Sequence, residues 1–291
     1  MRQTLCENRN MTNLPATLCA ITFQGNASNG LQQDAFFFVD DYYQETLGIT
    51  PVLHCDDAFC VAVSDGVAES NLSQYASLKT VKTVKQLWQN YLENSNQSPV
   101  MDISKIYEKV ATLPKRYYGA SATLALVYRS LAKASETNFI VVIKHIGDSR
   151  VYHFSANTKT WRCITRDHNL LNQLIDEKAG NENRQVDFIE YNQVGMASPL
   201  YALTDCLIAD SDLDSNPMPA YDSQTLKVSS DDCLVVCTDG VHDLVPCEEW
   251  QSIDKHTDLQ AWLKQLHKQI YASEGRAYDN ATAILVRFDE R

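Results

Sequence analysis

The chain has 291 residues, with 25 Lys and Arg against 37 Asp and Glu, which gives a formal net charge of −12 and a pI near 5.0. This acidic balance excludes a protein that binds nucleic acid through a basic surface, because contacts with phosphate backbones need many Lys and Arg side chains. Hydrophobic residues make up 44% and charged residues 21% of the chain, which is typical of a globular protein and not of a disordered acidic tail.

Strand and helix patterns follow one another irregularly along the chain. Apolar runs rich in β-branched and aromatic residues predict strands at 17–23, 35–39, 58–63, 121–128, 139–144, 150–154, 233–237 and 281–288. Apolar residues at three- and four-residue spacing predict helices over 78–93, 103–113, 168–178 and 258–271. This order lacks the regular alternation of a parallel doubly wound sheet, so it favours mixed or antiparallel sheets with helices outside them.

The stretch from 179 to 223 differs in composition from the rest of the chain. It is rich in Asn, Asp, Ser and Pro and contains only short apolar pieces. Loops of this length are uncommon inside compact domains and usually serve as lids or binding loops. No repeat or linker divides the remaining sequence, so we predict a single domain over 1–291 with one long irregular excursion.

Targeting and membrane segments are not evident in the sequence. Residues 1–13 are polar and carry Arg2, Glu7 and Arg9, so they lack the apolar centre of a signal peptide. No uncharged apolar stretch approaches the roughly 20 residues that a membrane span needs. The nine cysteines are odd in number, and several lie inside apolar runs, which is typical of reduced, buried thiols. We therefore expect a cytoplasmic protein with no membrane or nucleic-acid partner.

Four aspartates stand at the ends of predicted strands. Asp65 and Asp239 each follow an apolar strand and precede a glycine, and they form the only two Asp-Gly dipeptides in the chain. Asp34 and Asp279 stand just before two other predicted strands. A hairpin turn is the simpler interpretation of Asp-Gly, but the residues that follow both dipeptides lead towards helices. We therefore favour a site in which these carboxylates meet.

Carboxylates that meet need a positive partner, because like charges brought together resist ionisation. No matching set of Lys or Arg accompanies these aspartates. Divalent cations that prefer oxygen, Mg²⁺ or Mn²⁺, would supply the charge. Zinc fits this set poorly, because the seven histidines show no ligand spacing such as His-x-x-x-His.

Seven short motifs follow one another along the chain. They occupy 33–35, 63–67, 119–123, 146–150, 164–169, 237–240 and 279–282, and they read QDA, VSDGV, GASAT, IGDSR, ITRDHN, CTDG and DNAT. Each motif is weak alone, but in this order they resemble the successive motifs of the metal-dependent serine/threonine protein phosphatases, the type 2C family. The resemblance covers about residues 20–288, and the compact form is similar to that of bacterial members.

The resemblance implies an α+β fold, a four-layer α-β-β-α sandwich with two mostly antiparallel central sheets. It implies hydrolysis of phosphoserine and phosphothreonine in proteins, by a hydroxide that two Mg²⁺ or Mn²⁺ ions activate. The implied partner is a phosphorylated protein, the substrate of a serine/threonine kinase.

The resemblance also assigns roles to residues of the aspartate motifs. Asp65 would bridge the two ions, Asp239 and Asp279 would complete the ligands of one ion, and the carbonyl of Gly66 would bind the other. Asp34 would hold a metal-bound water. The four aspartates form the predicted catalytic set, and Gly66 is predicted as a metal ligand only.

A third ion, as in bacterial relatives, would lie at Asp148, and the excursion over 179–223 would be the substrate-side flap. Four flap residues are possible further ligands of this ion, and the sequence does not choose among Asp205, Asp210, Asp212 and Asp214.

Two of the motifs also have simpler interpretations. In isolation, the segment 147–150 would be a tight turn in which Arg150 pairs with Asp148. Asp167 and His168 precede a predicted helix, and we interpret them as an N-cap with a hydrogen-bonded histidine.

The chain departs from the family pattern where the substrate phosphate binds. Family members commonly have an arginine five residues before the first-motif aspartate, and Asn29 stands there in this chain. An amide gives hydrogen bonds but no charge, so Asn29 would bind phosphate weakly unless Arg2, Arg9 or Arg184 replaces the missing charge. A second hypothesis is therefore a pseudophosphatase or phosphoprotein-binding regulatory module with weak turnover.

Overall fold

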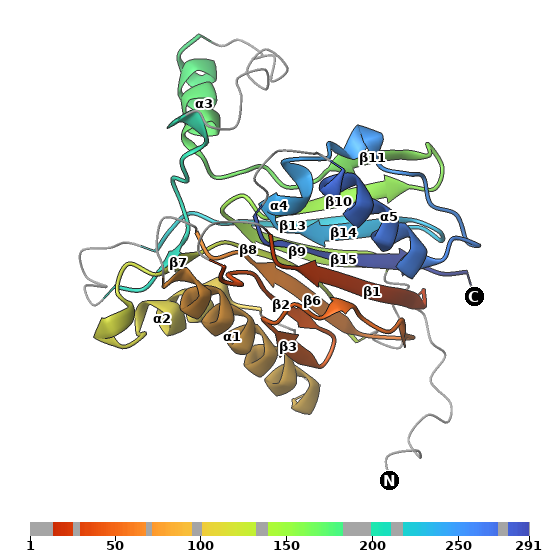
Figure 1. Ribbon diagram of the computed structural model, residues 1–291, viewed down its shortest axis with the longest axis horizontal. Coiled ribbons are helices and arrows are strands. Elements are labelled where there is room, and N and C mark those ends of the chain that lie inside the picture. Colours follow the sequence, from red (N-terminus) through yellow and green to blue (C-terminus); the bar gives the residue numbers. More distant parts are fainter. Residues whose placement is uncertain are drawn as a thin grey trace.

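The centre of the molecule consists of two antiparallel sheets that lie face to face between helices (Figure 1). The computed structural model describes residues 14–25, 30–67, 72–94, 101–131, 139–182, 199–210, 218–272 and 279–290. All the strand pairs in the described residues are antiparallel.

The six-stranded sheet has the order β13-β9-β8-β6-β2-β3. Its strands are β2 (Ala35–Phe38), β3 (Asp41–Tyr43), β6 (Phe59–Ser64), β8 (Leu124–Arg129), β9 (Ile140–Ile146) and β13 (Asp222–Lys227). The seven-stranded sheet has the order β11-β10-β14-β15-β1-β4, with β5 also paired to β1. Its strands are β1 (Ala16–Phe23), β4 (Gly48–Ile49), β5 (Leu53–Cys55), β10 (Arg150–Ser155), β11 (Thr160–Cys163), β14 (Cys233–Cys237) and β15 (Ala281–Phe288). A small third sheet pairs β7 (Ser121–Ala122) with β12 (Leu207–Ile208).

Helices cover the outer face of each large sheet (Figure 1). Helices α1 (Ser73–Glu93) and α2 (Ile103–Ala111) lie outside the six-stranded sheet, where they share one apolar cluster with β2, β6 and β8. Helices α4 (Asp239–His242) and α5 (Leu259–Tyr271) lie outside the seven-stranded sheet. Helix α3 (Leu170–Glu182) projects away from both sheets. The predicted α-β-β-α sandwich is confirmed.

The central strands are buried on both faces, which explains their sequence pattern. A third apolar cluster fills the space between the sheets with side chains such as Leu18, Phe36 and Phe59. All eight residues of β1 are buried, and β1 pairs with β15 along its whole length. Strands covered on both faces carry continuous apolar runs instead of alternating ones, and all eight strand regions predicted from such runs contain strands.

We predicted that the polar stretch over 179–223 is irregular, but parts of it form regular secondary structure. It includes the end of α3, all of β12 and the start of β13. Strand β13 forms an edge of the six-stranded sheet and pairs with β9 over six residues, from Asp222 opposite His145 to Lys227 opposite Ile140. Five of its six residues are exposed, so the sequence shows no apolar alternation there. Residues 183–198 and 211–217 of the predicted flap lie outside the described residues.

Cysteines and charges are distributed as the composition suggests. The eight cysteines in the described part of the chain are free, and Cys60, Cys233 and Cys237 are buried as predicted.

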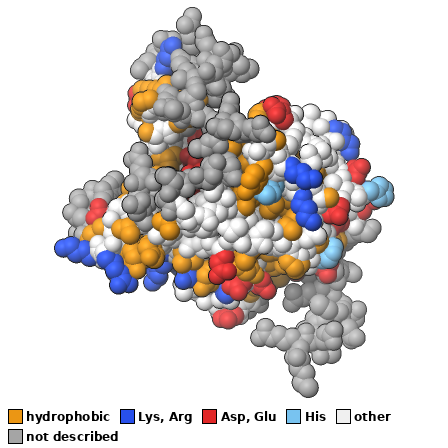
Figure 2. Space-filling model, viewed as in Figure 1, with side chains coloured by type: hydrophobic (Ala, Val, Ile, Leu, Met, Phe, Trp, Pro, Cys, Tyr) orange, Lys and Arg blue, Asp and Glu red, His pale blue; other side chains and the backbone are white. Residues whose placement is uncertain are grey.

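Acidic and basic side chains are scattered over the face shown in Figure 2, so the negative surplus forms no single patch there. In the ranges that the structure covers, the helices lack the combination of length and apolar composition needed to cross a membrane.

Candidate active site

The five predicted site aspartates come from neighbouring strand ends of both large sheets. Asp34 precedes β2 and Asp65 follows β6, and these strands pair side by side in the six-stranded sheet. Asp239 follows β14 and Asp279 precedes β15, which are neighbours in the seven-stranded sheet. Asp148 lies in the turn from β9 to β10, where the chain passes from one sheet to the other. The aspartates therefore meet where the two sheets share an end.

Gly240 permits the start of α4 to lie close to the start of β15. A Cβ atom at this position would overlap the backbone carbonyl of Asn280, so only glycine lets the start of α4 lie against the start of β15. Next to it, the Thr238 hydroxyl donates to Asp34 Oδ2 at 2.8 Å. The same hydroxyl oxygen accepts the backbone N–H of Thr282 at 3.0 Å. Thr238 thus fixes a carboxylate of one sheet to the backbone of the other.

Thr123 connects the backbone around Asp65 with the turn that carries Asp148. Its backbone N–H donates to the carbonyl of Asp65 at 2.9 Å, and its hydroxyl oxygen accepts the Asp65 N–H at 3.3 Å. The hydroxyls of Thr123 and Ser149 are 2.6 Å apart. Gly147 has φ of +92°, and a Cβ atom there would collide with Thr123, so glycine is required at this turn.

Burial and mutual repulsion raise the pKa values of the clustered carboxyls. Burial is the main cause for all four shifted groups, and it raises the pKa of Asp34 to about 7 and that of Asp239 to about 6. The pKa values of Asp65 and Asp148 are also raised well above normal, first by burial and then by the charge of Asp239. The carboxyls of Asp65 and Asp239 lie within hydrogen-bonding contact of each other. Burial and neighbouring negative charges both disfavour the ionised form of a carboxyl, which is why these pKa values are raised.

The cluster fits divalent cations that prefer oxygen ligands. Its donor atoms are all oxygens, and among the described residues the Oδ1 atoms of Asp34 and Asp239 are buried without a hydrogen-bond partner. Asp65, Asp148 and Asp239 are half-buried, so the cluster is open to solvent on one side. Several carboxylates with unused oxygens match Mg²⁺ or Mn²⁺, which would also neutralise the charge.

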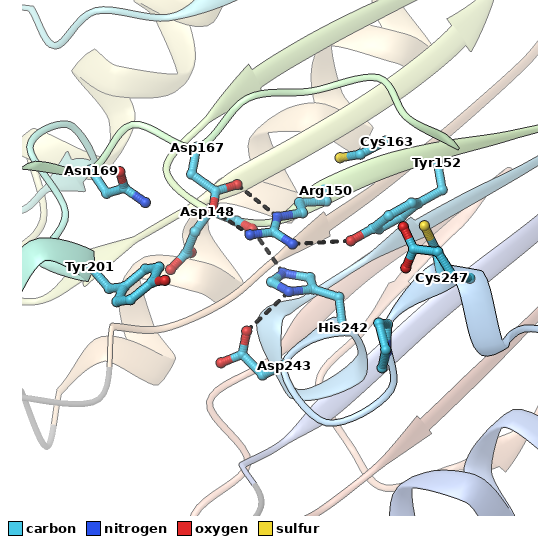
Figure 3. Close-up of a pocket in the computed structure, with 12 residues that line it drawn as sticks. Asp148, Arg150, Tyr152, Cys163, Asp167, Asn169, Tyr201, His242, Asp243 and Cys247 are labelled. Atoms are coloured by element: carbon cyan, nitrogen blue, oxygen red, sulfur yellow. Dashed lines mark hydrogen bonds and ion pairs between the residues drawn. The ribbon is translucent and has the colours of Figure 1, made fainter. Parts of the chain in front are cut away.

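A cavity of about 410 Å³ adjoins the cluster at Asp148 (Figure 3). Arg150 lies on its wall, and its Nε and Nη2 donate to the two carboxylate oxygens of Asp167 at 2.8 and 2.6 Å. Its Nη1 donates to the Tyr152 hydroxyl at 3.1 Å. Burial alone would raise the pKa of Asp167, but the Arg150 guanidinium outweighs burial and lowers it. Arg150 therefore pairs with Asp167 and not with Asp148, contrary to the simpler interpretation of the turn.

The predicted N-cap of the following helix was assigned to the wrong residue. Asp167 is engaged by Arg150, and the Oδ1 atom of Asn169 accepts the N–H of Asn172 at 2.9 Å, just before α3 begins at Leu170. His168 is hydrogen-bonded, as predicted, because its Nδ1 accepts the N–H of Gly147 at 3.0 Å.

Two further residues at the site were missed by sequence reasoning. His242 Nε2 donates to the carbonyl of Asp148 at 3.1 Å, and its Nδ1 faces Asp243 Oδ1 at 3.0 Å. The charge of Asp243 raises the pKa values of Asp148 and Asp239. Both residues follow Asp239 by three and four positions, and helical spacing from that aspartate could have placed them at the same end of the sheet.

The remaining predicted residues are not part of the cluster that the structure describes. Asp205 Oδ1 accepts the N–H of Ala220 at 2.8 Å, which closes a loop of the flap region. Asp205 and Asp210 are not among the main charges that act on the pKa of Asp148. Six residues lie outside the described ranges: Arg2, Arg9, Asn29, Arg184, Asp212 and Asp214.

Two stacked antiparallel sheets with an aspartate cluster at their shared end define a protein of the metal-dependent phosphatase class. The family model for protein phosphatase 2C matches residues 28–280, which is most of the chain. The chain belongs to the protein phosphatase 2C family.

Individual relatives agree with this family. A putative protein phosphatase of Mycoplasma genitalium is 28% identical over 174 residues, which span 60% of this chain and 60% of that protein's length. The serine/threonine phosphatase of S. agalactiae has the same fold, with a TM-score of 0.64 and 18% identity over 94% of this chain and all of that chain. The catalytic domain of the phosphatase PstP, solved with two manganese ions, has a TM-score of 0.56 and 14% identity over 95% of this chain and all of that domain.

Proposed function

We propose that this chain is a Mg²⁺- or Mn²⁺-dependent phosphatase that hydrolyses phosphoserine and phosphothreonine in proteins. The observation that carries the proposal is the meeting of the Asp34, Asp65, Asp239 and Asp279 carboxyls from two sheets, where burial raises the pKa values of Asp34, Asp65 and Asp239. Such a cluster is costly to fold unless cations compensate it. The family match favours hydrolysis over the pseudophosphatase hypothesis.

The aspartates have distinct proposed roles. Asp65, Asp239, Asp279 and the carbonyl of Gly66 would hold two ions, which would supply Lewis-acid activation of water and neutralise charge on the phosphoryl group. The Oδ2 atom of Asp34 accepts a hydrogen bond from the Thr238 hydroxyl. Its Oδ1 atom has no hydrogen-bond partner among the described residues and could accept a hydrogen bond from the attacking water. The two manganese ions of the PstP catalytic domain support a site for two ions.

For a third ion at Asp148, we propose Asp243 in place of Asp205 as a second ligand. Asp243 is among the charges that raise the pKa of Asp148, whereas Asp205 is bonded to the backbone of the flap region. Asp167 also lies near, but both of its oxygens accept from Arg150.

The substrate phosphate would depend mainly on the ions for its binding. Arg150 is the one Lys or Arg that lines the described cavity, and its guanidinium is committed to Asp167 and Tyr152. Asn29 would add at most neutral hydrogen bonds. We propose that the partner is a phosphorylated substrate of a serine/threonine kinase that approaches the cluster from the solvent side.

The test is a phosphatase assay on p-nitrophenyl phosphate and a phosphothreonine peptide with added Mn²⁺. The variant Asp239→Asn should lower kcat/KM by about 100-fold or more, because the Lewis-acid contribution amounts to several kcal/mol. The matched control is Asp40→Asn, an exposed aspartate in the β2–β3 turn at the opposite end of β2 from Asp34.

Three outcomes are decisive for this assay. Equal rates for wild type and Asp239→Asn, or a rate that EDTA leaves unchanged, would contradict the proposal. If calorimetry showed Mn²⁺ binding by the wild type but no turnover occurred, the pseudophosphatase hypothesis would replace it.

A further inference from the structure

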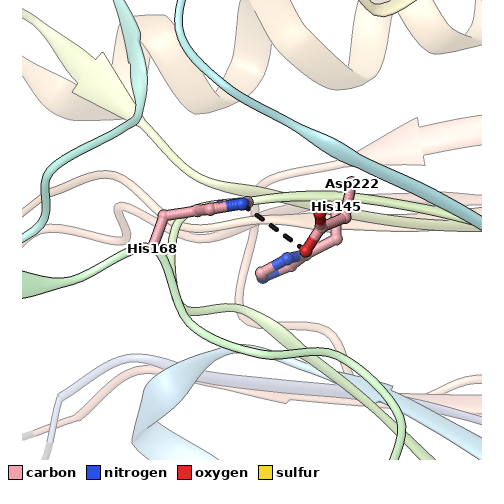
Figure 4. Close-up of side chains that lie close together, drawn as sticks. All are labelled: His145, His168 and Asp222. Carbon is pink, nitrogen blue, oxygen red and sulfur yellow. Dashed lines mark ion pairs between the residues drawn. The ribbon is translucent and has the colours of Figure 1, made fainter. Parts of the chain in front are cut away.

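A second group of ionisable side chains lies beside the aspartate cluster and shares no residue with it. His145, His168 and Asp222 each offer one possible ligand atom, and these three atoms lie within 4.8 Å of one another (Figure 4). His168 Nε2 is 3.6 Å from Asp222 Oδ2. We call this group the histidine cluster.

The backbone, and not side-chain flexibility, brings the histidine cluster together. Asp222 of β13 stands directly opposite His145 of β9 in the antiparallel pair, so both side chains lie on the same face of the sheet. His168 is attached to the end of β9 because its backbone N–H donates to the carbonyl of Gly147 at 2.9 Å. The strand before the Asp148 turn, the segment before α3 and the strand that begins at the end of the flap region therefore all contribute.

His145 is the anomalous member of the cluster. Its side chain is fully buried, and neither ring nitrogen has a hydrogen-bond partner among the described residues. The Ser149 backbone is near enough to act on the pKa of His145, but without normal hydrogen-bond geometry, and burial lowers that pKa to about 3. The ring is therefore neutral and has a nitrogen lone pair with no protein donor, which is unfavourable inside a protein.

The two histidine rings are stacked. Their centroids are 4.9 Å apart and their planes differ by 19°. Ordinary imidazole packing could produce this stack, but it would leave both nitrogens of His145 unsatisfied. Because imidazole lone pairs lie in the ring plane, a cation bound by both histidines requires one ring to turn out of the stack. The cation would then use one of the nitrogens of His145, and Asp222 stands opposite His145 on the same face of the sheet.

We propose that His145, His168 and Asp222 bind a Zn²⁺ ion, with a water molecule as the fourth ligand. Two histidines and one carboxylate are a typical ligand set for zinc, and imidazole suits zinc better than Mg²⁺. Neighbouring ligand atoms around a tetrahedral Zn²⁺ ion lie about 3.4 Å apart. The His168–Asp222 distance of 3.6 Å is already close to this value. The ligand atoms lie within 4.8 Å of one another, so the widest separation has to shorten by up to about 1.4 Å. The Asp222 side chain is 54% exposed, so it can move and the ion has access from solvent.

Zinc binding would change the turn that carries Asp148. In this structure His168 Nδ1 accepts the N–H of Gly147, so a neutral ring carries its proton on Nε2. When Nε2 binds the ion, one proton moves from Nε2 to Nδ1 through solvent, and the ring gains or loses none in total. Nδ1 then carries a hydrogen and no longer accepts from Gly147. Occupation of the histidine cluster therefore releases Gly147, the neighbour of Asp148.

The first experiment is a Zn²⁺ titration of the full chain in saturating Mg²⁺, by competition with a chromophoric chelator. Asp222→Asn should weaken Zn²⁺ binding at least about tenfold, since even loss of an outer-shell partner commonly costs 10- to 100-fold. Asp40→Asn is the matched control and should bind like wild type. Asp239→Asn should also keep this Zn²⁺ site, because it alters only the aspartate cluster.

Two results of the titration would overturn the proposal. One is wild-type affinity and stoichiometry in Asp222→Asn, and the other is loss of Zn²⁺ binding in Asp239→Asn, which would place the ion in the aspartate cluster.

A second experiment observes the rings directly by NMR. Zn²⁺ should shift the ring nitrogen signals of His145 and His168, and the amide of Gly147 should exchange faster with solvent. Unchanged ring signals at saturating Zn²⁺ would refute the site. Neither experiment measures phosphatase activity, so failure of this inference is distinguishable from failure of the proposed function.

Discussion

The aspartate cluster and the histidine cluster lie on two sides of the same turn, yet they differ in charge and donor atoms. Asp148 belongs to the first, and His145, three residues earlier, belongs to the second. The first gathers carboxyls whose pKa values rise because they are buried together. The second combines one exposed carboxylate with a buried neutral ring.

This difference shows how one fold can offer two kinds of metal ligand. Oxygen ligands with surplus negative charge suit Mg²⁺ and Mn²⁺, whereas imidazole nitrogens suit zinc. The aspartates come from strand ends, where the chain leaves a buried sheet. The histidine cluster instead needs an edge strand, β13, to place Asp222 opposite His145. The clusters can be separated experimentally because no residue belongs to both.

Among variants that leave every proposed ligand in place, the largest effect is expected from Gly240→Ala, which disturbs the aspartate cluster alone. The new Cβ atom would overlap the Asn280 carbonyl and push Asp239 away from Asp279. A displacement of about 1 Å can cost about 100-fold in rate, and overpacking costs about 1–3 kcal/mol of stability. Mn²⁺-dependent kcat/KM and urea unfolding measure the two effects.

A control for this variant is Gly30→Ala, where the added Cβ has open space around it and only the φ of +62° is unfavourable. Zn²⁺ binding by the histidine cluster should persist in Gly240→Ala. Activity near the wild-type level in Gly240→Ala would show that the spacing of Asp239 and Asp279 is unimportant.

A pH titration of stability should distinguish the two clusters next. A carboxyl whose folded-state pKa is raised stabilises the fold fully below its unfolded-state pKa, and this contribution is lost as pH rises through the folded-state value. For Asp34, with a folded pKa of about 7, the metal-free protein should lose up to about 4 kcal/mol between about pH 4 and pH 7. His145, with a folded pKa of about 3, contributes with the opposite sign. Its ring is neutral in the folded protein but protonated in the unfolded chain below about pH 6.5, so its contribution to stability rises with pH over this range. The Asp34 contribution is therefore the difference between the wild type and a variant that lacks the Asp34 carboxyl.

The measurement is urea unfolding in EDTA across this pH range, repeated with Mn²⁺ and with the variant Asp34→Asn. Mn²⁺ should restore stability more at about pH 7 than at about pH 4, because protons compete with the ion at low pH. Asp34→Asn removes only the Asp34 contribution, so this variant should gain stability relative to the wild type as pH rises from about 4 to 7. A difference in stability between wild type and Asp34→Asn that stays constant from about pH 4 to pH 7 would mean that the pKa of Asp34 is not raised in the folded protein.

The smallest effect is expected from Thr123→Val, at the boundary of the two clusters. The Thr123 hydroxyl contacts the Asp65 N–H and the Ser149 hydroxyl, and the side chain lies under Gly147. Valine keeps the shape but leaves buried donors unpaired, which costs about 1–3 kcal/mol. We expect about tenfold weaker Mn²⁺ binding, as for other loss of outer-shell support.

Calorimetric Mn²⁺ titrations check this prediction, and Thr123→Ser, which retains the hydroxyl, is the control. Serine should bind Mn²⁺ nearly as the wild type does. Equal weakening in both variants would assign the effect to the lost methyl group and not to the hydroxyl.

The sequence was most informative where strands are buried. Runs such as 233–237 and 281–288 are mostly apolar because a sheet covers one face and helices the other. Asp239 and Asp279 lie next to the ends of these strands, as predicted. Strand β13 was missed for the opposite reason, because its exposed residues carry no periodic apolar signal. Edge strands of this kind are defined by pairing with a neighbour, which local sequence does not record.

Side-chain partners at the site were harder to predict than strand ends. Asp167 precedes a helix and has the composition of an N-cap, but Arg150 from another strand binds it and Asn169 takes the capping role. The histidine cluster shows the same limitation, since His145 and Asp222 meet through strand pairing across a long separation in sequence. Ligand spacing detects only sites whose residues lie on one local element.

The division of ligands between the two sheets has a mechanical consequence. The contact between the sheets is made of apolar side chains, and such contacts are non-directional, so they resist separation of the sheets better than sliding. Ions held by Asp65 of one sheet and Asp239 of the other would act as cross-links that oppose sliding. Loading with metal should therefore lock the register between the sheets at one end of the sandwich and leave the opposite end, with the β2–β3 turn, as free to move as before.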